Sequence, residues 1–190
     1  MDGTDFSATR RSLLAALTAT GTLPWCAVPI DARAPALKAF GGEEPPPLHR
    51  TREGRTLSRF RYQNAESFFL GVETGALRYQ PEMLYHVGIV QQLGLSSFLL
   101  DVGFDDAWCA RHIGLHVSKS LSYANAAGLN AISPDLARLT AILSPYDKWR
   151  YADLLPFPSS DRLADDQIRE LTRSLLDMVS AATGHRRRCN

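Results

Sequence analysis

Apolar side chains between residues 81 and 184 recur every three or four positions, and this spacing places them on one face of an α-helix. Residues 165–183 show the pattern most clearly. The apolar positions there are Ile168, Leu171, Leu175, Met178, Val179 and Ala182. Few stretches alternate apolar and polar residues as strands do, and residues 62–190 contain no Asn-Gly or Asp-Gly hairpin turn. The sequence therefore predicts an all-α domain, an irregular bundle of five to seven helices.

Start and stop signals divide this domain into segments. Helices are expected at residues 64–77, 81–94, 105–127, 134–143 and 165–183, with shorter elements at 95–104 and 146–155. Asn64 and Ser133 are good N-caps, and Gly94 and Gly184 are good helix ends. Two glycines weaken the prediction of a helix at 64–77, so a short strand is the alternative for this segment.

The segment before this domain has a different composition. Residues 41–55 are rich in glycine, proline and charge and poor in apolar side chains. Such a composition predicts an extended or disordered arm, with order beginning near Phe60. We therefore expect a flexible arm at 37–61, a helical domain at 62–184 and a basic tail at 185–190.

The formal net charge of +1 conceals an asymmetry. Residues 37–61 carry six Lys and Arg against three Glu, whereas residues 62–184 carry nine against fourteen Asp and Glu. Three more arginines follow at 186–188. Basic arms can bind nucleic acid or anionic lipid, although short terminal runs are usually solvated. The acidic body and the lack of aromatic residues among the terminal arginines argue against a nucleic-acid partner.

Two adjacent arginines, Arg10 and Arg11, precede an uncharged and weakly apolar run at residues 12–30. Two prolines in the run disfavour a transmembrane helix, which needs about 20 mainly apolar residues. A charged start, an apolar middle and a small-x-small site are typical of a secretory signal, and Ala34-Pro35-Ala36 provides the site. We expect residues 1–36 to be a signal peptide and the mature chain to have no integral membrane anchor. The alternative is an N-terminal helix of a cytoplasmic protein.

The route of export can be named more closely. Residues 9–14, Thr-Arg-Arg-Ser-Leu-Leu, resemble the twin-arginine export signal, in which a polar residue, two arginines and any residue precede two bulky apolar residues. The resemblance implies a periplasmic or otherwise exported protein that is translocated already folded. It also implies a class of cargo that includes cofactor proteins and subunits that travel with a partner.

One short segment holds the side chains that best fit a metal. On a single helix, Cys109, His112 and His116 would occupy an arc of roughly 60°. Thiolate and imidazole ligands suit zinc or copper, and imidazole also binds haem iron. However, Cys109 also belongs to an apolar stripe, and only His86 and Asp101 suggest themselves as a further ligand. A bound metal or haem is therefore an alternative to a core cysteine beside two ordinary histidines.

Four aromatic residues crowd into a stretch of twelve. They are Tyr146, Trp149, Tyr151 and Phe157. Because Trp149 and Tyr151 cannot share one helical face, some of the four should be exposed or should pack across a loop. Exposed aromatic residues commonly anchor protein interfaces. The alternative is a satellite core beneath the loop at 156–160.

No catalytic constellation is visible in the sequence. A Gly-x-Ser-x-Gly turn and a phosphate-binding glycine loop are missing, and the carboxylate pairs at 105–106 and 165–166 fall where they cap helices. The sequence therefore favours an exported, non-catalytic helical accessory or interaction protein that binds a protein partner or a co-exported subunit. The alternatives are a small periplasmic metal- or haem-binding protein that uses Cys109, His112 and His116, and a cytoplasmic DNA-binding regulator.

Overall fold

The computed structural model describes residues 47–154 and 163–187, without the side chains of residues 152–154. The chain divides into two compact units, Met1–Ile30 and Asp31–Asn190, and every described residue belongs to the second. The signal-like segment at 1–36 and most of the arm before the bundle lie outside the described residues.

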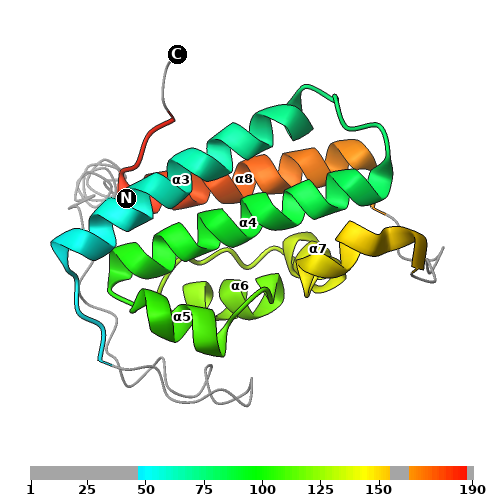
Figure 1. The fold of residues 1–190 in the computed structure, drawn as a ribbon. Coiled ribbons are helices and arrows are strands. Elements are labelled where there is room, and N and C mark those ends of the chain that lie inside the picture. Colours follow the sequence, from blue (N-terminus) through cyan, green and yellow to red (C-terminus); the bar gives the residue numbers. More distant parts are fainter. Residues whose placement is uncertain (1–46, 155–162, 188–190) are drawn as a thin grey trace, which may run out of the picture. The chain divides into compact units, whose positions relative to one another are not determined.

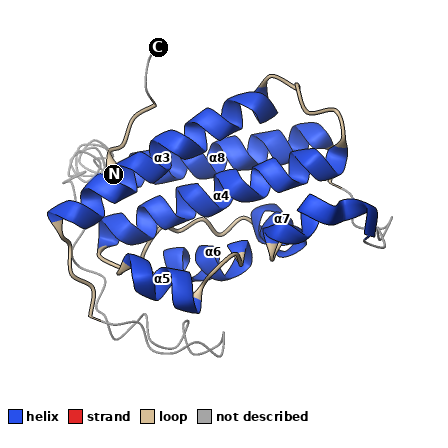
Figure 2. Cartoon of the chain, in the orientation of Figure 1, coloured by secondary structure: helices blue, strands red, loops and turns tan. Residues whose placement is uncertain are grey.

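The described residues form helices and contain no strand, which confirms the all-α prediction (Figures 1 and 2). The elements are α3 (Arg52–Glu73), α4 (Gln80–Val102), α5 (Asp106–His112), α6 (Val117–Ala126), α7 (Pro134–Leu143), the 3-10 helix η1 (Tyr146–Leu154) and α8 (Asp165–Thr183).

α4 is the central helix of the bundle. It contacts α3, α6, α7, α8 and η1. In Figure 1, α3 and α8 run along one side of α4, while α5, α6 and α7 lie on the other side. Among the described helices, α4 alone has the length and apolar composition to cross a membrane, and 72% of its most apolar window is buried in this bundle. Because neighbouring helices cover most of its surface, the apolar residues of α4 are not restricted to one face.

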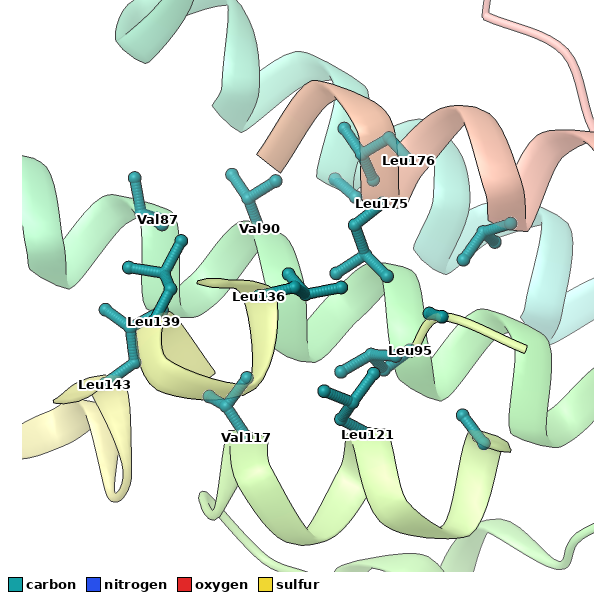
Figure 3. Packing of buried hydrophobic residues seen from close by; sticks show 14 of the residues in the cluster. Val87, Val90, Leu95, Val117, Leu121, Leu136, Leu139, Leu143, Leu175 and Leu176 are labelled. Carbon is teal, nitrogen blue, oxygen red and sulfur yellow. The ribbon is translucent and has the colours of Figure 1, made fainter. Parts of the chain in front are cut away.

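The core lies where α4, α6, α7 and α8 meet. Figure 3 shows leucine and valine side chains from these four helices pointing toward one another. The labelled residues are Val87, Val90, Leu95, Val117, Leu121, Leu136, Leu139, Leu143, Leu175 and Leu176. Every one of them is at least 95% buried. The three-and-four spacing in the sequence therefore marks the faces that form this core.

The prediction of a flexible arm to residue 61 is wrong from Arg52 onward, because α3 begins there. The Thr51 hydroxyl caps the helix by accepting a hydrogen bond from the Gly54 N–H at 2.9 Å. The first turns of α3 bury few apolar side chains and are held by polar contacts instead. For example, Arg61 pairs with Asp106 at 2.6 Å and donates to Ser96.

The prediction that Gly94 ends a helix is also wrong, since α4 continues to Val102 and includes the residues expected as a separate element at 95–104. Gly94 serves packing: a Cβ there would lie 2.9 Å from Leu176 Cδ2. The true end is Gly103, whose φ of 108° is left-handed and favours glycine.

The helix predicted at 105–127 is two helices. α5 ends at His112, Gly114 adopts a left-handed φ of 59°, and α6 begins after His116. The apolar stripe of this region is nevertheless buried as expected, with Ile113 and Val117 both in the core. A stripe with steps of four is therefore compatible with a break, provided that the turn keeps its side chains facing the core.

The prediction of Asn64 as an N-cap is wrong, because Asn64 lies inside α3, which ends at Glu73 rather than at residue 77. The other elements agree with the sequence. α7 begins at Pro134 with the Ser133 cap, and α8 spans the predicted residues and ends at Gly184 with φ 72°. The short element predicted at 146–155 is η1.

Candidate functional site

A buried polar cluster between α3, α4 and the segment after α8 contains serine, aspartate and histidine, the residue types of a hydrolytic triad. The cluster consists of Ser58, Ser97, Asp101 and His185. Gly184 turns the chain, and the His185 carbonyl accepts from the Ser180 hydroxyl at 2.6 Å, so that the imidazole enters the bundle. His185 is only 3% exposed, and Ser58 is fully buried.

The hydrogen bonds of Ser58 favour one tautomer of His185. Ser58 Oγ donates to the Ser97 carbonyl oxygen at 2.7 Å and lies 2.7 Å from His185 Nε2. A hydroxyl has one hydrogen, and the carbonyl can only accept. The neutral imidazole therefore carries its proton on Nε2 and donates it to Ser58 Oγ.

This geometry differs from a hydrolytic triad. In a triad, serine bonds to one imidazole nitrogen and aspartate to the other, so that the imidazole can take the serine proton. Here Asp101 Oδ1 lies 3.9 Å from Nε2, the nitrogen that also faces Ser58. Because Nε2 is a donor, it cannot act as the base for Ser58. The cluster fastens the C-terminal segment to α3 and α4.

A second polar group lies farther along α3, where Tyr62 is one turn and Glu66 two turns beyond Ser58. Glu66 is buried, accepts from the Tyr62 hydroxyl at 2.5 Å and pairs with both terminal nitrogens of Arg173 at 2.6 and 2.9 Å. Burial alone would raise the pKa of Glu66, but Arg173 and Tyr62 outweigh it and lower that pKa. Burial, with the Glu66 hydrogen bond, raises the pKa of Tyr62 to about 12. Glu66 is therefore an ionised carboxylate that links α3 to α8.

His185 should make stability depend on pH. Burial lowers its pKa below the ordinary 6.5; Asp101 opposes this shift, and Arg55 and Arg59 add to it. The unfolded chain then binds the proton more readily, so the free energy of unfolding is highest above pH 6.5 and falls as the pH drops below it. Urea unfolding between pH 8 and pH 5 should show a larger loss in the wild type than in His185→Gln, whose amide still donates to Ser58. Parallel pH curves would contradict this role for His185.

The structure does not bring Cys109, His112 and His116 together as one ligand set. Their predicted shared face required a single helix, and the break at Gly114 removes it. His112 stacks on Trp108 with ring centroids 4.9 Å apart, while His116 is exposed at the start of α6. No group of three His, Cys, Asp or Glu side chains within 47–154 and 163–187 is arranged to hold a metal ion.

Cys109 is a core residue. It is 7% exposed, and burial, supported by Asp106, raises the pKa of its thiol to about 12 although Arg61 opposes the shift. The thiolate needed for nucleophilic or ligand chemistry is therefore disfavoured.

Of the four aromatic residues that the sequence suggested as partner anchors, Trp149 and Tyr146 pack inward. Trp149 is buried and its indole N–H donates to the Ile142 carbonyl oxygen at 3.2 Å, and Tyr146 is half-buried. Tyr151 is 63% exposed. Phe157, like Arg10 and Arg11 of the signal, lies outside the described residues. Trp149 thus belongs to the main hydrophobic core and Tyr146 packs against it, while the loop at 156–160 of the satellite-core alternative lies outside the described residues.

Sequence reasoning missed the buried cluster. It considered Asp101 only as a metal ligand and treated His185 as the first residue of a solvated tail. The contributing residues are separated by up to 127 positions, so no local spacing joins them. A weak signal exists in the buried face of α3, where Ser58 takes a position that an apolar residue would otherwise hold.

Comparison of the chain with protein-family models, with curated proteins and with solved structures gives no significant match.

Proposed function

We propose that this chain is an exported, non-catalytic helical accessory protein that acts by binding a partner. The observation that carries the proposal is the enclosure of the Ser58–His185 pair, in which a serine hydroxyl lies at hydrogen-bond distance from an imidazole. In the tautomer that these hydrogen bonds favour, the imidazole proton sits on the nitrogen that faces Ser58, and the side chains have almost no contact with solvent. A substrate therefore has neither a base nor access at this pair.

Export is supported by the sequence. The twin-arginine-like residues 9–14 and the Ala34-Pro35-Ala36 site agree in position and order with an export signal. A domain stabilised by a well-packed core suits a route that carries folded cargo. The exposed apolar side chains Ile132 and Tyr151, 82% and 63% exposed, offer contact area to a partner.

A chemical test separates this accessory role from a serine hydrolase. A fluorophosphonate reacts with a serine whose proton is taken by a neighbouring base: the serine oxygen bonds to phosphorus and fluoride leaves. We expect no adduct on the folded protein by intact mass, with a serine hydrolase labelled in parallel as the positive control. One adduct per chain that disappears in Ser58→Ala and in His185→Gln would overturn the non-catalytic proposal.

A further inference from the structure

The fold brings together two basic segments that lie at opposite ends of the domain sequence. Burial of His185 lays the C-terminal segment along α3, where Arg55 donates to the Thr183 carbonyl oxygen at 3.4 Å. Farther along, Arg187 pairs with Glu73 at 3.2 Å. Arg187 therefore lies toward the C-terminal end of α3, whereas Arg186 directly follows His185, whose side chain bonds to Ser58 near the start of α3.

We define the basic surface as Arg52, Arg55, Arg59 and Arg186, all of which are exposed. The first three recur at spacings of three and four, which places them on one side of α3. Arg55 and Arg59 are close enough to His185 to lower its pKa. Within the described part of the chain, no ion pair involves Arg52, Arg59 or Arg186. The crowding of like charges favours an anionic partner.

Apolar side chains stand beside this basic surface on the outward face of α3. Phe60 is 58% exposed and lies between Arg59 and Arg61 in the sequence, and Phe68 is 44% exposed two turns farther along. At 100° per residue the two phenyl rings project within 80° of each other, with Arg59 on the flank. Basic residues flanking exposed phenylalanines are typical of helices that lie in a membrane interface.

We propose that the basic surface and Phe60 bind the surface of an anionic phospholipid bilayer. The guanidinium groups would pair with lipid phosphates, and the Phe60 ring would enter the headgroup region. A planar bilayer fits the convex outer face of a helix, whereas a single nucleic-acid strand is usually held in a charged groove. Nucleic acid is therefore the competing outcome in the test. The interaction needs no cleavage or export, so it can be assayed on the purified full chain.

The test is cosedimentation with vesicles of phosphatidylcholine alone or mixed with phosphatidylglycerol. We expect binding only to the phosphatidylglycerol-containing vesicles, and weaker binding as salt is raised. The variant Arg52→Gln/Arg59→Gln/Arg186→Gln should lose about a hundredfold in vesicle affinity, since each basic residue near the surface contributes about a fivefold factor. Phe60→Ser should lose several-fold.

A matched control removes three exposed arginines elsewhere. Arg78→Gln/Arg111→Gln/Arg150→Gln has the same net charge as the test variant and should bind nearly as well as the wild type. Circular dichroism checks that both variants remain helical. Equal loss in the two variants, equal binding to phosphatidylcholine, or tighter binding to a single-stranded oligonucleotide would overturn the proposal. None of these outcomes bears on export, which is measured separately in cells.

Discussion

Replacing Glu66 with glutamine is expected to lower the free energy of unfolding by about 3 kcal/mol, the lower end of the cost of breaking a buried ion pair. Glu66 is 4% exposed in its side chain, and it bonds to Tyr62 and Arg173 at once. Removal of its charge leaves Arg173 partly buried without its main partner. Urea unfolding at neutral pH, followed by circular dichroism, measures the loss.

The matched control uses the other carboxylate on the same arginine. Asp177 pairs with Arg173 at 3.1 Å, but its side chain is 66% exposed. Asp177→Asn should therefore cost no more than about 0.5 kcal/mol, as exposed ion pairs do. Equal effects of Glu66→Gln and Asp177→Asn would contradict the assignment of Glu66 as the buried link between α3 and α8.

Replacing Gly88 with alanine is expected to destabilise the protein by about 2 kcal/mol through overpacking. A Cβ at position 88 would lie 2.4 Å from the Cβ of Tyr146, an atom that no side-chain rotation can move away. η1 must shift from α4 to admit the methyl group. This penalty outweighs the gain in helix propensity that alanine brings. Thermal and urea unfolding of the variant measure the net change.

The same substitution elsewhere should have the opposite sign. Gly71 is helical in α3, and a Cβ there would meet nothing within 4 Å. Gly71→Ala should therefore stabilise the protein by about 0.5 kcal/mol, because alanine loses less backbone freedom than glycine on folding. A loss of stability in both variants would show that close contact with Tyr146 is not the cause at position 88.

The sequence predicted helices well where apolar spacing and caps agree. α7 and α8 are the clearest cases, since Ser133 and Gly184 mark their ends and one apolar face fills the space between. The prediction at Gly94 was wrong because glycine often ends helices, whereas here its missing side chain leaves room for Leu176 to pack against α4. Only the packing partner distinguishes these roles.

The candidate site was less predictable for a related reason. The start of α3 lacks an apolar stripe because its inward side chains, such as Ser58, make hydrogen bonds to partners about 40 and 127 positions away. The metal hypothesis required one helix through residue 116, and a single left-handed glycine at 114 breaks it. Tertiary contacts decide both outcomes, and neither leaves a periodic signal in the sequence.

Native mass spectrometry after separation of periplasm from cytoplasm tests the proposed function most directly. Three C-terminally tagged proteins are expressed in a bacterial host. They are the wild type, the variant Arg10→Lys/Arg11→Lys and, as a matched control, the variant Arg33→Lys. We expect a periplasmic species that begins at Leu37 and retains a copurified protein. The paired substitution should keep the chain in the cytoplasm, and Arg33→Lys should not. A full-length cytoplasmic wild type, unaffected by either change, would contradict export and the accessory role built on it.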